Sequence, residues 1–216
     1  MLVSAGQCQR NLPSSRNDAV LRAISSRRMV RSFSNAPVDH DTITTLVSAL
    51  LSGPSAGNTQ PLDALVLIGD DAATYWDTTL PVARRDGFPW PGLLNAPVLL
   101  IPYVRPAAYV DRYGEPDKAS TGLGESPEAW TVPYWWVDGG AAVENVLIAV
   151  QSLALGACFF GQFEHEDAVR ARFGVPDGHR AVGTIALGHP DGSDRTSRSA
   201  KRPKRSVSDV THWGAW

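Results

Sequence analysis

The sequence predicts an α+β fold in a single domain, on three observations. Four apolar runs have the length of buried strands, and segments with helical periodicity separate them along the chain. The chain has 216 residues, a length at which one hydrophobic core is still favourable. Hydrophobic residues make up 43% of the chain and charged residues 19%, which is typical of a folded domain and not of a disordered chain.

Charge, hydropathy and cysteine content exclude several classes of function. A formal net charge of -2 gives no overall attraction to nucleic acid or to an anionic membrane. No apolar run approaches the ~18 residues that a membrane-spanning helix needs. The two cysteines, Cys8 and Cys158, are too few for a disulfide scaffold and favour a reducing compartment. The five histidines are scattered and no CxxC or HExxH motif occurs, so we expect no metal site. Because no membrane-spanning run is present and the cysteine content favours a reducing compartment, we expect a cytoplasmic protein.

Two helices are predicted near the start of the domain. Residues 1–16 are predicted to form a loose N-terminal tail, so that the domain spans residues 17–216. A short helix follows Asn17, because apolar residues recur there on one helical stripe before an arginine cluster. The clearest helical pattern comes next, with Asp39 or Asp41 as its cap and Gly53-Pro54 at its end. Its apolar stripe consists of Ile43, Leu46, Val47, Leu50 and Leu51.

The strands are predicted from continuous apolar runs. Residues 64–68 and 98–101 are expected to be buried strands, with a helix around residues 72–76 between them. A long helix over residues 137–155 precedes the other two strands, at residues 157–160 and 181–187, which flank a helix around residues 167–172. Residues 191–216 are polar and then sparsely apolar, which predicts an extended C-terminal arm.

The segment between residues 103 and 136 is rich in proline, glycine and aromatic residues and shows no regular period. A long irregular connection inside a compact domain is often a functional lid. Trp130, Trp135 and Tyr113 therefore have two interpretations: a small satellite core, or the wall of a channel that contacts a substrate.

Two further motifs carry chemical content. Arg27, Arg28 and Arg31 lie within five residues of one another, which fits either a solvated charge run or an anion clamp, since guanidinium groups match phosphate oxygens. The loop PSAGNTQP, from Pro54 to Pro61, reads by itself as an ordinary turn. The loop becomes informative together with the arginine cluster, which it follows by about 25 residues, because the two form an ordered pair of motifs.

Five motifs in series resemble the flavin-dependent nitroreductase superfamily. RRMVRSF resembles that family's RRSxRxF, and PSAGNTQP resembles its PSxxNxQP. LALGACFFGQF is similar to LGLGTxWIGGF, and VGTIALGHP is similar to a strand that ends in GxP. The tail RPKRSVSDVTHW resembles RKPLEEVVHW. Because the five motifs occur in the family's order from about residue 17 to 216, the chain is identified as a member of that superfamily.

The resemblance implies a fold, a cofactor and an assembly. The fold is a nitroreductase-like sandwich with a mixed central sheet flanked by helices, in an intertwined homodimer that binds FMN at its interfaces. The implied reductant is NADPH or NADH, and the implied reaction is ping-pong hydride transfer through flavin N5 to nitroaromatics, quinones or similar electron-poor small molecules. Since the flavin supplies the chemistry, no catalytic side chain is expected.

The resemblance also implies which residues contact FMN. It places Arg27, Arg28 and Arg31 on the phosphate, together with one basic residue of the C-terminal arm. Lys204 is the residue that matches the motif, and the neighbouring Arg202 and Arg205 are the alternatives to it. Met29 stands where the family has a serine, so only its backbone is expected to contribute. The turn at Gly161 and Gln162 is expected at the N5 and O4 edge of the flavin. A loop from the partner subunit is expected to supply Pro54, Ser55, Ala56, Asn58 and Gln60.

Two alternative functions remain open from the sequence. One is a specialised relative on the same scaffold, such as a reductive dehalogenase or a flavin-consuming enzyme. The other is a flavin-binding protein that no longer catalyses a reaction, and Met29 is the only residue that suggests it.

Overall fold

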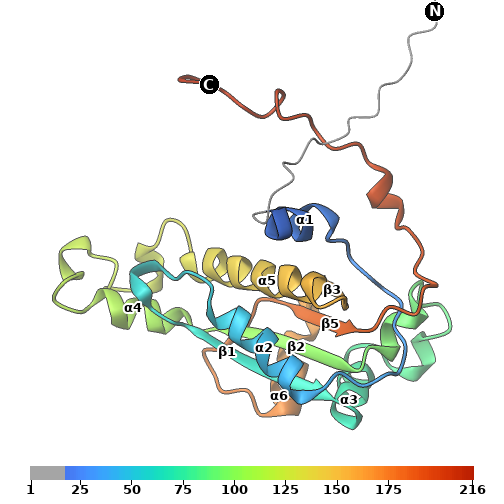
Figure 1. Ribbon diagram of the computed structural model, residues 1–216. Helices are drawn as coiled ribbons and strands as arrows, with labels where there is room; N and C mark the ends of the chain where they lie inside the picture. Colours follow the sequence, from blue (N-terminus) through green and yellow to red (C-terminus); the bar gives the residue numbers. More distant parts are fainter. Residues whose placement is uncertain (1–17) are drawn as a thin grey trace, which may run out of the picture.

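The computed structural model describes residues 18–216, so the predicted tail at residues 1–16 lies outside the described residues. One five-stranded sheet forms the centre, with the order β1-β2-β5-β3 and with β4 paired to β2 (Figure 1). The strands are β1 Leu62–Ile68, β2 Val98–Val104, β3 Gly156–Phe160, β4 Arg180–Ala181 and β5 Thr184–Gly188. Their pairs are antiparallel. A parallel bridge between Met29 and Ala157 adds the chain after the first helix to the edge at β3 and makes the sheet mixed.

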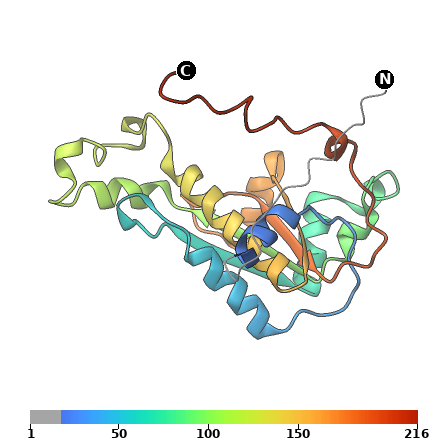
Figure 2. The same cartoon turned by 45° about the horizontal axis from the view of Figure 1, so that its top comes forward.

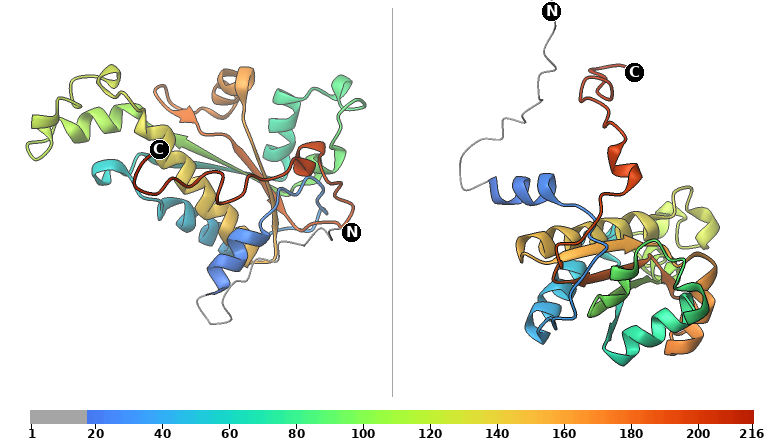
Figure 3. Two further views of the ribbon diagram at one scale, coloured as in Figure 1. Left: turned by 90° about the horizontal axis from the view of Figure 1, so that it is seen from above. Right: turned by 90° about the vertical axis from the view of Figure 1, so that its right-hand side faces the viewer.

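Helices cover both faces of this sheet. α2 packs with α5 on one face, and α3 packs with α6 on the other (Figure 3). α1 lies over α5 (Figure 1). The helices are α1 Asp18–Ser26, α2 His40–Leu51, α3 Asp70–Thr79, α4 Pro106–Tyr113, α5 Tyr134–Ser152 and α6 Glu166–Phe173. This arrangement confirms the predicted α+β sandwich.

The alternation of side chains along the strands explains the two layers. In β3, Ala157 belongs to the core under α2 and α5, whereas Cys158 belongs to the core under α3 and α6. Cys158 is a free, buried cysteine, and burial raises the pKa of its thiol. Because Cys158 is buried among apolar neighbours, we interpret it as an unreactive core side chain.

Two predictions about strand burial and connections differ from the structure. β2 is buried along its whole length, since strands flank it on both sides and helices cover both faces of the sheet. β1 was expected to be buried on both faces, but Leu67 is its only buried residue, and Ile68 at its end is 47% exposed. β1 lies at the edge of the sheet and pairs only with β2. The segment at 103–136 is not irregular throughout, because β2 continues to Val104 and α4 follows with Pro106 in its first turn.

Ala154, just after α5, has a backbone φ of +56°, a conformation that favours glycine. It stands at the second position of LALG, where the family motif has glycine. We predict that Ala154→Gly raises the free energy of unfolding by about 0.5–1 kcal/mol, because relief of strain outweighs the extra freedom of the unfolded chain. Urea unfolding measures this, with Ala149→Gly inside α5 as a control of opposite sign. A destabilised Ala154→Gly variant would contradict the prediction.

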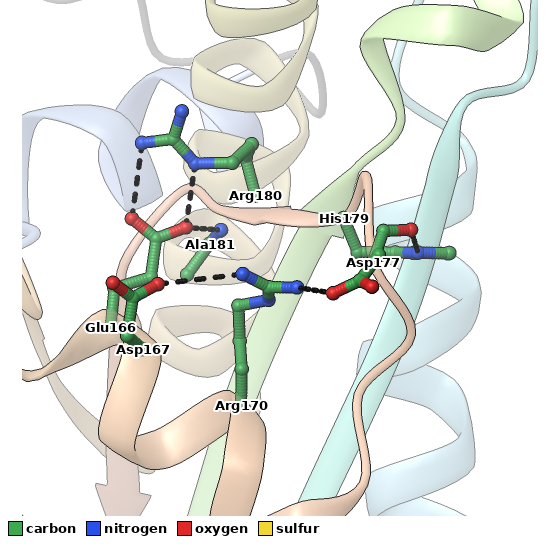
Figure 4. A network of polar contacts seen from close by, with 7 residues as sticks. All are labelled: Glu166, Asp167, Arg170, Asp177, His179, Arg180 and Ala181. Carbon is green, nitrogen blue, oxygen red and sulfur yellow. Dashed lines mark hydrogen bonds and ion pairs between the residues drawn. The ribbon is translucent and has the colours of Figure 1, made fainter.

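A polar network joins α6 to β4 (Figure 4). The Glu166 carboxylate accepts hydrogen bonds from Arg180 Nε at 2.9 Å and from the Ala181 N–H at 3.0 Å. Arg170 bridges Asp167 at 3.4 Å and Asp177 at 2.8 Å. Burial alone would raise the pKa of Glu166, but the hydrogen bonds from Arg180 and Ala181 outweigh it and hold the pKa below its ordinary value.

The lowered pKa of Glu166 gives a pH-dependent prediction. A carboxylate whose pKa is lower in the folded state adds stability above its unfolded pKa, and this stability is lost as pH falls through the folded pKa. Glu166→Gln should therefore lower the free energy of unfolding by about 1 kcal/mol at pH 7, and the difference should shrink below about pH 4. Urea unfolding between pH 3 and 7 measures this. The control, Asp167→Asn, alters a side chain that is 95% exposed and should change little. A deficit in Glu166→Gln that does not vary with pH would refute the prediction.

The C-terminal arm leaves the layered body after β5 (Figures 1 and 3). Its apolar side chains have almost no cover, with Trp213 91% and Val207 79% exposed. Within residues 18–216, every helix is too short or too polar to cross a membrane.

Candidate functional site

Four of the predicted cofactor residues, Arg27, Arg28, Met29 and Arg31, line one cavity, which we call the arginine cavity. The cavity has a volume of about 400 Å³ and lies between the chain after α1 and the start of the C-terminal arm. Its cationic lining consists of Arg27, Arg28, Arg31 and Arg195, and Met29, Ser197 and Ser199 also line it. The members of the arginine cluster surround a common space, as the anion-clamp interpretation requires, and the Arg28 side chain beside it is 62% exposed.

Asp194 holds this cluster in place. Its carboxylate accepts a hydrogen bond from Arg28 Nη1 at 2.7 Å and another from the Arg31 N–H at 2.9 Å, and its side chain is only 7% exposed. Arg27 pairs with Glu144 of α5 at 3.2 Å. The sequence alone did not single out Asp194, since it lies more than 160 residues from both of its partners.

Met29 also has a structural role. Its Sδ accepts the Phe159 N–H at 3.4 Å, beside the bridge that joins Met29 to Ala157. The side chain at the position where the family has serine is thus used to pack the strand edge against β3.

A second cavity, of about 360 Å³, opens beside the end of β3, and we call it the ring-lined cavity. The turn at Gly161 and Gln162 borders it, and Arg31 lines both this cavity and the arginine cavity. Seven aromatic side chains line it, namely Tyr75, Trp76, Phe88, Trp90, Phe159, Phe160 and Phe163. The Arg31 guanidinium lies 5.1 Å from the centre of the Trp90 ring. A ligand that joins an anionic group to a flat ring could therefore extend from one cavity to the other past Arg31.

Buried polar atoms at the ring-lined cavity are left without protein partners. Gln162 is 5% exposed; its Nε2 donates to Thr184 Oγ1 at 3.1 Å, while its Oε1 is unpaired. Trp76 Nε1 is likewise buried and unpaired. Burial raises the pKa of Tyr75, whose hydroxyl also contacts Thr184, to about 12, so it stays protonated at neutral pH. Both unpaired atoms are themselves shielded from solvent by the side chains around them.

The PSAGNTQP loop lies elsewhere. Ser55, Asn58 and Gln60 line a separate cavity of about 240 Å³ next to the start of β1, which shares no residue with the arginine cavity. In Figures 1 and 2 this loop and the chain after α1 lie toward opposite ends of the sheet. Within one chain, therefore, the two motifs do not meet.

Lys204 and Arg205 are exposed on the C-terminal arm and line none of the cavities described above. Arg205 Nη2 bonds to the Asp209 carbonyl within the arm. Their contact with a phosphate stays a prediction.

The aromatic residues expected to contact substrate form a satellite core. Trp130 and Trp135 are 7% and 8% exposed and pack around Tyr109, with Tyr113 against Trp130 at a ring distance of 4.7 Å. Trp130 Nε1 donates to the Leu123 carbonyl at 2.9 Å. In the single chain these rings contact one another and not the ring-lined cavity, so a role in substrate contact stays a prediction.

Within residues 18–216, no group of three or more histidine, cysteine or acidic side chains is placed to hold a metal ion.

The comparisons with known proteins agree with this architecture. The family model described as the nitroreductase family matches residues 24–189. A relative from Archaeoglobus fulgidus, provisionally named NADH dehydrogenase/NAD(P)H nitroreductase, is 25% identical over 176 residues, 79% of this chain and 84% of the relative. The 4-nitrobenzoate reductase of Nocardioides sp. is 25% identical over 218 residues, 84% of this chain and 85% of the relative.

Among solved structures, the fold resembles nitroreductase CinD from Lactococcus lactis in complex with nicotinic acid, at a TM-score of 0.70 and 19% identity, over 89% of this chain and 97% of that one. A complex of a provisionally assigned nitroreductase with FMN, from Desulfovibrio desulfuricans, is similar at a TM-score of 0.62 and 22% identity, over 89% of this chain and 94% of that one. Since the family model covers most of the sequence and the fold agrees, the chain belongs to the nitroreductase family.

Proposed function

We propose that this protein is an FMN-dependent NAD(P)H oxidoreductase that reduces nitroaromatics, quinones or related electron-poor rings. The observation that carries the proposal is the position of Arg31, which lines both the arginine cavity and the ring-lined cavity. FMN combines a phosphate with a flat three-ring system, and the two adjoining cavities match these two chemistries.

The donor set of the arginine cavity fits a phosphate. Guanidinium groups form charge-assisted hydrogen bonds with phosphate oxygens, and Arg27, Arg28 and Arg31 would hold the phosphate. We propose that Lys204 or Arg205 joins them from the arm, although neither lines the cavity in the single chain. Ser197 adds a hydroxyl at the same cavity.

The ring-lined cavity fits a flavin ring. Aromatic side chains favour a planar ligand, and the side chains of Trp76 and Gln162 line the same cavity. Backbone N–H groups at Gly161 and Gln162 would favour negative charge on the reduced ring. When bound, FMN would accept a hydride from NAD(P)H and pass two electrons to the acceptor, so this chain needs no acid-base triad.

The names of the relatives support the reductant and the acceptor class. Two archaeal relatives carry names that include NAD(P)H nitroreductase, and the Nocardioides relative is a 4-nitrobenzoate reductase. CinD is known as complexes with nicotinic acid, chloramphenicol and 4-nitrophenol, all of which carry an aromatic ring.

A homodimer completes the proposed site. The residues from Pro54 to Gln60 do not reach the arginine cavity of their own chain, so they would meet the flavin of a partner subunit. The apolar arm gains burial only if a second surface covers it.

Absorbance spectroscopy of the purified protein tests the proposal. We expect a yellow protein with about one FMN per subunit, bleached anaerobically by NADH or NADPH and reoxidised by a nitroaromatic or a quinone. A colourless protein that does not take up added FMN would contradict the proposal.

A further inference from the structure

The backbone of the loop at residues 54–60 is unusual. Gly57, Asn58 and Gln60 have φ angles of +63°, +54° and +51°. Glycine and asparagine tolerate this left-handed region, whereas glutamine is strained there. Such a conformation persists only where neighbouring groups hold it, so the contacts of the loop decide its shape.

A buried carboxylate in α5 makes the first of these contacts. Asp138 is 6% exposed, and its Oδ2 accepts a hydrogen bond from the Ala56 N–H at 2.8 Å. The same oxygen accepts one from the Tyr109 hydroxyl at 2.7 Å. Tyr109 belongs to α4 and is fully buried in the satellite core of Trp130 and Trp135. One oxygen atom thus joins the loop to the segment at 103–136.

The second contact comes directly from α4. Arg112 Nε donates to the Gly57 carbonyl at 2.8 Å, and its other nitrogens bind the Asp117 carboxylate in a bidentate pair at 2.8 Å. The Tyr113 ring packs against the loop so closely that a Cβ at Gly57 would lie 2.9 Å from it. The Ala56 N–H, the Gly57 carbonyl and the space beside the Gly57 Cα are therefore all occupied by groups from α4 and α5.

We propose that Asp138 and Arg112 are positioning residues that fix the flavin-facing loop and make its conformation, and thereby FMN affinity, depend on helix α4. The inference rests on the proposed function. It gives helix α4, within the segment at 103–136, a role in cofactor binding in addition to any contact of that segment with the substrate. One hydrogen bond runs from the Ala56 N–H to Asp138, and the other runs from Arg112 to the Gly57 carbonyl. Without these two bonds, the left-handed backbone at Asn58 and Gln60 relaxes and the loop no longer meets the flavin.

Hydrogen exchange of the FMN-free protein and FMN affinity from quenching of flavin fluorescence test this. Asp138→Ala and Arg112→Ala should each speed amide exchange at residues 54–60 and raise the Kd for FMN about tenfold, the usual effect of losing a hydrogen bond to a charged group. Asp138→Asn keeps an acceptor for the Ala56 N–H and should restore most of the affinity. Tyr109→Phe removes one of the two bonds to Asp138 and should have an intermediate effect.

A control separates positioning from general loss of stability. Val150→Ala alters a buried side chain of the same helix, far from the loop, and should lower stability while leaving the Kd unchanged. Unchanged exchange at residues 54–60 in the Asp138 and Arg112 variants would overturn the inference, as would faster exchange with an unchanged Kd. Failure of the proposed function is recognised separately, because the parent protein itself would then not quench flavin fluorescence.

Discussion

A chain that ends at Arg202 is expected to lose both the homodimer and bound FMN. The truncation removes Lys204, Arg205 and the distal part of the arm with its apolar side chains, but it keeps every residue that lines the arginine cavity. Val207, Val210 and Trp213 are 79%, 50% and 91% exposed in the single chain, and burial of such side chains contributes about 1.5–3 kcal/mol each. A partner subunit is the surface on which this burial would be gained.

Sedimentation velocity and the ratio of absorbance at 450 and 280 nm measure the two losses. Lys204→Ala is the matched variant, because it removes a charge and keeps the apolar arm. It should weaken FMN binding while the protein stays dimeric. A truncated protein that remains dimeric and yellow would rule out the proposed role of the arm.

Arg31→Ala is expected to raise the Kd for FMN by roughly ten- to a hundredfold, and more than Arg28→Ala does. The structure gives the reason, because Arg31 lines both cavities while the Arg28 guanidinium is already paired with Asp194 at 2.7 Å. Fluorescence titration of the FMN-free variants measures both values. Equal affinities in the two variants and the parent would remove these arginines from the proposed phosphate site.

Local pattern was sufficient for most of the secondary structure. The apolar spacing from Ile43 to Leu51 predicts α2, and Asp39 caps it through a hydrogen bond from the Thr42 N–H at 2.7 Å. Three of the four apolar runs lie within β1, β2 and β3, as predicted. The fourth, at residues 181–187, is divided between β4 and β5, with residues 182–183 outside both strands. Continuous apolar runs of this length are typical of buried strands. The helix α4 was missed, since its eight residues bury mainly Tyr109 and show too little of a period to detect.

The sequence by itself determined the α+β class, the family motifs and the order of helices and strands apart from α4 and the division of the last apolar run into β4 and β5. Each of these depends on residues that are neighbours along the chain. Only the tertiary structure decided that β1 is an edge strand, that the tryptophans form a satellite core, and that Asp194 and Asp138 organise the arginine cavity and the loop. Asp138 lies 82 residues from Ala56 and 29 from Tyr109, so no local pattern reports their contact. The physical reason is that burial is encoded by the spacing of apolar residues, whereas the partner of a buried polar group is fixed only when distant segments pack together.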